Sequence, residues 1–111
     1  MIEKIVLDFL NSKGFSTYCE EENNMPKEYV LIDKTGGGGD SMIRNATIAI
    51  QSFSISKIGA AELNEKIIAA MLDITELDDI CRCELNSDYD FTDTQRKKYR
   101  YQAVFDITYY C

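Results

Sequence analysis

Apolar residues recur at three- and four-residue intervals in two segments of the chain, a spacing that places them on one face of an α-helix. The first segment covers residues 2–10, and Gly14 follows it at the position where helices commonly end in a left-handed conformation. The second helix is expected to start after Ser54 or Ser56, whose hydroxyl can cap its first turn, and to run to about Asp73. Its apolar arc is unusually broad, so part of it should meet the first helix or a neighbouring subunit.

Strand-like patterns fill most of the remaining chain, and alternation of side chains is typical of a strand with one buried face. The expected strands cover residues 16–19, 29–33, 45–53, 79–85 and 99–110. Along the last of them one face should carry Tyr101, Ala103, Phe105, Ile107 and Tyr109, and in 79–85 one face should carry Cys81, Cys83 and Leu85. The order of elements predicts an α+β fold, a mixed and mainly antiparallel sheet of about four to five strands with two helices packed on one face.

Two segments between these elements interrupt the apolar pattern. The run TGGGGDS contains Gly36, Gly37, Gly38 and Gly39, and because glycine has high backbone entropy and no side chain to pack, we expect a flexible loop. Residues 87–98, SDYDFTDTQRKK, lie between the last two expected strands and should project as a hairpin or flap. Both segments should be mobile in a free subunit and become ordered on assembly.

Composition and charge then limit the classes of protein. The 111 residues suit one domain, and 19 acidic against 12 basic residues give a net charge of −7, which disfavours tight nucleic-acid binding. No apolar run approaches the roughly 20 residues of a membrane-spanning helix. Charged residues interrupt the N-terminal apolar positions, so no signal peptide is expected and the protein should remain in the cytoplasm where it is made. The four cysteines are therefore expected to be free thiols.

Candidate chemistry is sparse. The chain has no histidine, the commonest general base near neutral pH, so we expect a protein that is not an enzyme and has no cofactor. A carboxylate or thiol site stays open as an alternative. Cys81 and Cys83 lack the knuckle spacing typical of zinc sites, and the glycine run lacks the Lys and Ser/Thr of a phosphate-binding loop. Neither a bound metal nor a nucleotide is expected.

One segment combines both signs of charge. Its acidic half contains Asp88, Asp90 and Asp93, which lack the glycine and glutamate needed to complete a calcium loop, and its basic half contains Arg96, Lys97, Lys98 and Arg100. Each half could pair with the opposite half in a neighbouring subunit, which would suit a ring. Alternatively the two runs balance each other in solvent.

Several sequence features resemble one family of proteins. They are YVLID, the glycine-rich break, ATIAIQSFSISKIGAAELNEKI with Gln51, Phe53 and Ser56, and a last strand that begins with Arg100 and Tyr101. Over roughly residues 26–110 the chain resembles the tail-terminator and minor capsid proteins of long-tailed bacteriophages and prophages. The resemblance implies a virion protein made in the bacterial cytoplasm, whose ring, commonly a hexamer, caps the tail tube and joins it to the head.

The partners implied by this resemblance are other copies of the chain, the tail-tube protein and a head-completion or connector protein, and DNA would pass through the ring. Two alternatives remain open. The chain could itself be a head-completion or connector component, or it could be a small acidic binding module of the inhibitor or immunity type, which would be a monomer with one tight partner.

Overall fold

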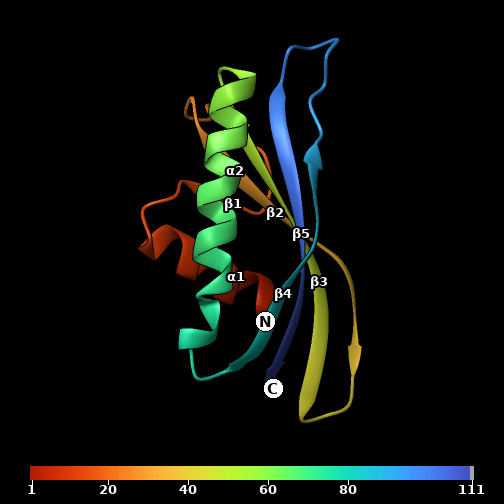
Figure 1. Cartoon of the computed structure of the whole chain (residues 1–111). Coiled ribbons are helices and arrows are strands. Elements are labelled where there is room, and N and C mark those ends of the chain that lie inside the picture. The colour runs from red at the N-terminus through yellow and green to blue at the C-terminus, as the bar shows by residue number, and fades with distance from the viewer. Residues whose placement is uncertain (111) are drawn as a thin grey trace.

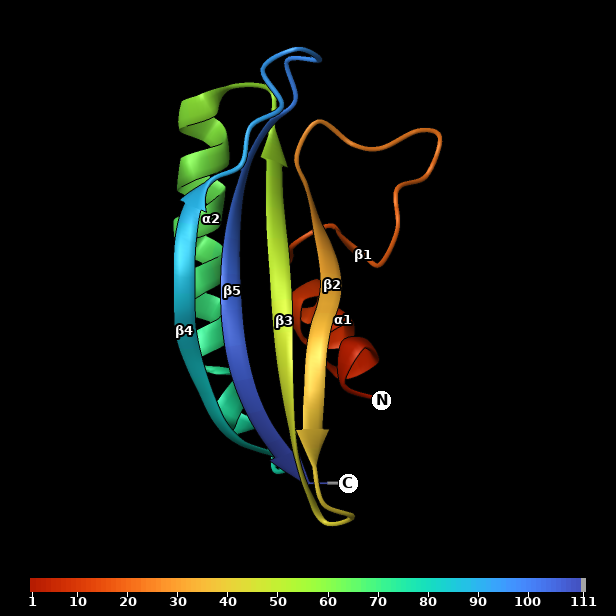
Figure 2. The ribbon, with the colours of Figure 1, turned by 90° about the vertical axis from the view of Figure 1, so that its right-hand side faces the viewer.

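The computed structural model describes residues 1–110 (Figure 1). In chain order its elements are α1 (Ile2–Ser12), β1 (Thr17–Tyr18), β2 (Tyr29–Gly39), β3 (Ile43–Ser54), α2 (Lys57–Leu72), the short 3-10 helix η1 (Ile74–Glu76), β4 (Ile80–Asp90) and β5 (Tyr99–Tyr110). The five strands form one sheet in the order β1-β2-β3-β5-β4, in which only the β1–β2 pair is parallel. Both helices lie on the same face of the sheet (Figure 2). The predicted α+β fold is confirmed.

The ends of both helices follow the signals in the sequence. After α1 the backbone of Gly14 is left-handed, with φ of +94°, and the amide of Phe15 donates to the carbonyl of Leu10 at 3.1 Å. Ser56 caps α2, since its hydroxyl accepts a hydrogen bond of 3.0 Å from the amide of Gly59. Neither helix in the described part of the chain is long and apolar enough to span a membrane.

The core lies between the two helices and one sheet face, and the central strands β3 and β5 contribute buried residues to it. Ile48 pairs with Phe105, and Ile50 pairs with Ala103, and all four are fully buried. Their side chains share a face because alternate residues of a strand point the same way. The face predicted for the last strand is therefore confirmed. The residues of α2 that enter the core are Ala60, Leu63, Ile67 and Met71. The broad apolar arc of α2 also contacts α1, one of the two contacts expected for it.

The loop predicted at Gly36–Gly39 is wrong, because these four glycines form the end of β2. Their partners on β3 are Thr47, Ala46, Asn45 and Arg44, in that order. The weak strand propensity of glycine is outweighed because β3 is held in place by β5 and offers a complete backbone ladder to β2. The reversal comes later, at Asp40, whose carboxylate accepts hydrogen bonds from the amides of Met42 and Ile43 at 2.9 and 2.8 Å.

The strand predicted at 79–85 is longer than expected, since β4 continues to Asp90. The expected loop therefore shortens to a turn of residues 91–98, closed by a bridge between Asp93 and Lys98. The predicted common face of Cys81 and Cys83 is also wrong. The pairing register shifts between Ile80 and Arg82, so that Ile80 and Cys83 face the core while Cys81 is exposed. Cys111 lies outside the described residues.

Candidate interaction surface

The sheet face opposite the helices carries a ladder of aromatic side chains that starts at β1. Tyr18 meets Tyr29 edge to face, with ring centroids 6.5 Å apart. Tyr29 in turn stacks on Phe53 of β3, with centroids 4.5 Å apart and planes inclined by only 7°. Tyr29 and Phe53 are only 8% and 3% exposed, although no helix covers this face. They form a second, smaller apolar cluster outside the main core.

Arg100 of β5 continues this ladder towards the edge strand β4. Its guanidinium carbon lies 5.6 Å from the ring centroid of Phe53 and 4.5 Å from that of Phe91, so the cation lies between two aromatic rings. Its Nε also donates a hydrogen bond of 2.7 Å to the carbonyl oxygen of Phe91. Tyr89 completes the ladder, edge to face with Phe91 at 5.9 Å. The ladder thus joins all five strands at one end of the sheet.

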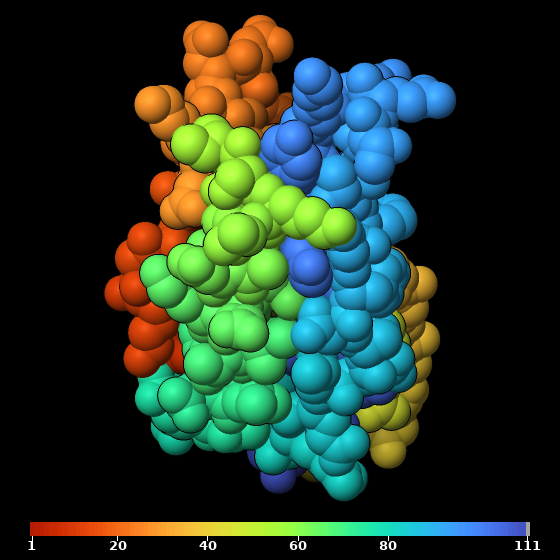
Figure 3. Space-filling model, turned by 45° about the horizontal axis from the view of Figure 1, so that its top comes forward, coloured from red at the N-terminus to blue at the C-terminus, as the bar shows by residue number. Residues whose placement is uncertain are grey.

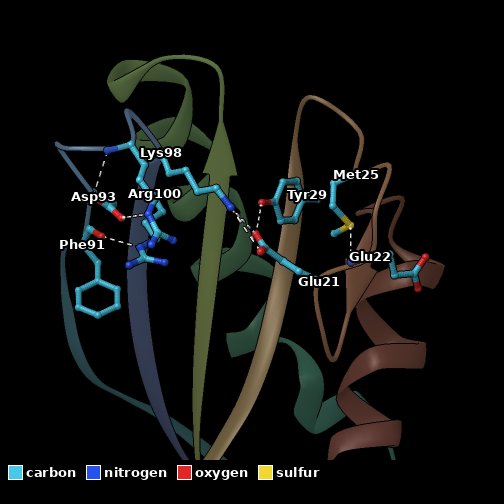
Figure 4. Close-up of polar contacts among 9 residues, drawn as sticks. Glu21, Glu22, Met25, Tyr29, Phe91, Asp93, Lys98 and Arg100 are labelled. Atoms are coloured by element: carbon cyan, nitrogen blue, oxygen red, sulfur yellow. Dashed lines mark hydrogen bonds and ion pairs between the residues drawn. The ribbon is translucent and has the colours of Figure 1, made fainter.

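Glu21 connects the two projecting segments at this end (Figure 4). Its carboxylate accepts a hydrogen bond of 2.7 Å from the Tyr29 hydroxyl and forms an ion pair of 3.0 Å with Lys98. The hydrogen bond from Tyr29, and then the contact with Lys98, lower the pKa of Glu21. Residues 19–28 and the 91–98 turn are therefore tied together across the sheet. Figure 3 shows both segments projecting at this end, with the start of α2 between them.

The acidic residues predicted for a subunit interface have partners within the chain. Asp88 accepts a hydrogen bond of 2.6 Å from the amide of buried Asn64 on α2. Asp90 forms an ion pair of 3.0 Å with Lys57, also on α2. Asp93 accepts a hydrogen bond of 3.3 Å from the backbone amide of Arg96 within the turn. The acids of β4 therefore hold this edge strand to the helix layer.

Two of the four predicted basic residues are likewise engaged within the chain, Lys98 by Glu21 and Arg100 by the aromatic ladder. Arg96 lies 3.8 Å from Asp93 with a side chain that is 79% exposed. Lys97 is exposed, has a left-handed backbone with φ of +54°, and forms no ion pair with any residue from 1 to 110. Arg96 and Lys97 thus remain the charges most open to a partner.

Sequence reasoning missed Glu21, Tyr29, Phe53 and Phe91 as parts of this surface. A signal was present for Phe53, because the alternation of its strand placed this large aromatic on the face opposite the core. Its partners could not be identified without the register between β2 and β3. Glu21 lies far from Lys98 in the sequence, so their ion pair gave no local pattern.

No known protein family matches this chain. No curated protein matches it either.

The opposite end of the sheet has a different chemistry. Ile43 pairs with Tyr110 at the far ends of β3 and β5, and these side chains are 46% and 52% exposed. Met42, in the adjoining β2–β3 turn, is 73% exposed. Three large apolar side chains thus lie at this tip. At the other end, charged and aromatic groups lie beside Ile55 and Ile58, which are 69% and 73% exposed. Exposed apolar side chains that adjoin one another are candidates for a contact surface.

The open face also has a shallow hollow of about 430 Å³ beside the glycines of β2, lined by Gly37, Gly38, Asn45, Ala46, Thr47, Asp106, Ile107 and Thr108. Its one carboxylate, Asp106, accepts hydrogen bonds of 3.1 Å from Thr47 and 2.9 Å from Asn86. Within residues 1–110 no three Cys, Asp or Glu side chains gather in a way that could hold a metal ion. The hollow offers polar contacts from Asn45, Thr47, Asp106 and Thr108.

Proposed function

We propose that this protein is a virion structural protein that forms a ring, terminates a phage tail tube and joins the tube to the head. The observation that carries this proposal is the chemical difference between the two ends of an elongated subunit. The chain measures 43 × 24 × 24 Å, and its long strands run from the charged and aromatic end to the apolar tip. A protein that joins two different structures needs two different contact surfaces.

A ring of such subunits, with its axis parallel to the strands, would present one kind of end on each of its two sides. The end formed by residues 19–28 and 91–98 would contact one partner, and the tip formed by Met42, Ile43 and Tyr110 would contact the other. Closed rings of this kind arise when one surface of a subunit binds a different surface of the next. The resemblance of residues 26–110 to tail terminators supports the assignment of the partners as tail tube and head.

The contacts at the charged end support a binding role for it. The pair Glu21–Lys98 joins the two projecting segments, and the cation of Arg100 packs on the ring of Phe91 in one of them. A surface that is ordered beforehand loses less conformational entropy when it binds. Arg96 and Lys97 then supply exposed positive charge for the partner, in a chain whose net charge is negative.

Electron microscopy of purified tail tubes incubated with the protein tests this proposal. We expect a ring at one end of each tube and no further growth of the tubes. The variant Arg96→Glu/Lys97→Glu should weaken binding at the charged end, whereas Lys4→Glu on α1 should not. Absence of any bound ring would contradict the proposal. If the chain is also monomeric and binds one other protein tightly, an acidic inhibitor or immunity-like module becomes the better assignment.

A further inference from the structure

We infer that neighbouring copies of this chain join through their sheets, with the glycine-rich half of β2 in one copy pairing antiparallel with β4 of the next. This inference rests on the proposed ring and names its subunit interface. The sheet has two lateral edges, which lie on opposite sides in Figure 2.

Both edges have backbone groups free for another strand. The short β1 pairs with β2 only at Val30 and Leu31, so the outer edge of β2 from Asp33 to Gly39 has no partner strand within residues 1–110. At the other side of the sheet β4 pairs only with β5, and its outer edge has no partner strand in the described part of the chain. Unpaired edge strands are templates for pairing with another chain.

The register of the sheet places these two free edges at the same height. Gly36 pairs with Thr47, Thr47 with Asp106, and Asp106 with Glu84, so Gly36 and Glu84 lie at opposite ends of one row. The next row on this face runs in the same way from Gly38 to Arg82. A rotation about an axis parallel to the strands would bring the glycine edge of one copy beside β4 of another.

Strand direction is also suitable for this contact. Three successive antiparallel pairings make β2 run opposite to β4 within one subunit. The same rotation leaves strand directions unchanged, so β2 of the neighbour would be antiparallel to β4. The antiparallel alternation of the sheet would continue across the interface, and the ring would have no free edge.

Gly36 and Gly38 are not explained by the fold of a single subunit. Neither has a left-handed backbone, and an added Cβ would meet nothing closer than 3.9 Å at Gly36 and nothing within 4 Å at Gly38. A larger residue would therefore fit, and glycine weakens a strand. Glycine in a strand often marks a place where another backbone approaches closely. This edge also lacks charged side chains from Gly36 to Gly39, whereas β4 carries Arg82 and Glu84. Pairing of β2 with β4 is thus favoured over pairing of two β4 strands.

Sedimentation velocity of full-length charge variants tests the pairing. In the ring, Gly36→Glu would place a second carboxylate beside Glu84 of the neighbour, so we expect the oligomer to be lost at concentrations where the wild type assembles. Adding Glu84→Lys should restore it. Ala69→Glu, on the exposed face of α2, is the matched control and should assemble normally. Circular dichroism should show that all three variants fold.

The outcomes separate this interface from the proposed function. If the wild type forms rings and Gly36→Glu does so equally well, the pairing is wrong while the proposed function stands. Gly36→Glu could also abolish assembly without rescue by Glu84→Lys. The glycine-rich half of β2 would then contact another surface, such as a second β2, and the pairing with β4 would be wrong. A wild type that stays monomeric at every concentration and on tail tubes would contradict both.

Discussion

Asn64 on α2 donates a hydrogen bond of 2.6 Å to a carboxylate oxygen of Asp88 on β4, and this bond joins the helix layer to the edge of the sheet. Asn64 is only 2% exposed, whereas Asp88 is open to water on its other side. A polar group left without a partner costs more free energy when it is buried than when water can reach it. The two partners of this bond are therefore unequal.

Replacement of Asp88 by Ala should lower the free energy of unfolding by about 1–3 kcal/mol, because the buried amide of Asn64 loses its acceptor. Asn64→Leu should cost less, since the freed Asp88 is solvated. Urea denaturation of the two variants gives the comparison. Equal destabilisation, or a greater loss in Asn64→Leu, would show that the bond does not govern this contact.

The aromatic ladder makes a second prediction about stability. Phe53 is 3% exposed between Tyr29 and Arg100, so Phe53→Ala should destabilise the fold by about 3–5 kcal/mol, as for a core aromatic. Phe91, which is 40% exposed, is the control, and Phe91→Ala should have a much smaller effect. Thermal unfolding measures both. A minor effect of Phe53→Ala would show that the ladder contributes little to the stability of the fold.

A third prediction concerns pH. Hydrogen bonds from the Thr92 hydroxyl and amide, followed by the contact with Lys57, lower the pKa of Asp90 from 3.8 to about 2. Because the charged form is the one favoured by folding, this stabilisation is complete above pH 3.8 and is lost as the pH falls towards 2. Attachment of β4 to α2 should loosen over that range.

An NMR titration of the Asp90 carboxyl group checks this directly. We expect a midpoint near 2 in the wild type and a higher one in Lys57→Met, where the bonds from Thr92 remain. Lys4→Met removes a distant ion pair with Asp8 and should leave the Asp90 midpoint unchanged. A wild-type midpoint at the ordinary value would contradict the contacts described for Asp90.

The cysteines should differ in reactivity. Burial, and then the neighbouring carboxylates of Asp106 and Glu84, raise the pKa of the Cys83 thiol to about 11, whereas Cys19 and Cys81 are exposed. Iodoacetamide at mildly alkaline pH should therefore modify Cys83 most slowly of the three, as measured by peptide mass spectrometry.

Replacing Cys81 by Ala and Cys83 by Val should leave the metal content of the protein unchanged. Elemental analysis measures this. Stoichiometric zinc in the wild type that is lost in the variant would contradict the expectation that these thiols bind no metal.

The patterns that were readable in the sequence were the regular ones. The alternation that ends in Ile107 and Tyr109, and the serine cap at Ser56, are local signals set by side-chain period and by an unpaired amide. The register shifts in β4 were not readable, because a single extra residue reverses every later side chain without any change in composition. The strand at Gly36–Gly39 depends on a neighbouring strand, so its sequence alone indicated a loop.

The candidate surface was predicted only in part for the same reason. The charges between Asp88 and Arg100 were identified from their clustering, but their partners Asn64, Lys57 and Glu21 come from distant segments. The sequence could place these charges near the sheet end, and it could not distinguish charges used within the chain from those left for a partner. In the structure that distinction leaves Arg96 and Lys97 exposed.

Native mass spectrometry of the wild-type protein over a range of concentrations tests the central claim most directly, namely that this chain acts as an assembled ring. We expect one closed oligomer, a hexamer if the resemblance to tail terminators holds, in equilibrium with monomer and with few intermediates, because closure adds an interface without adding a subunit. A monomer at every concentration, or an open series of oligomers without a preferred size, would contradict the account.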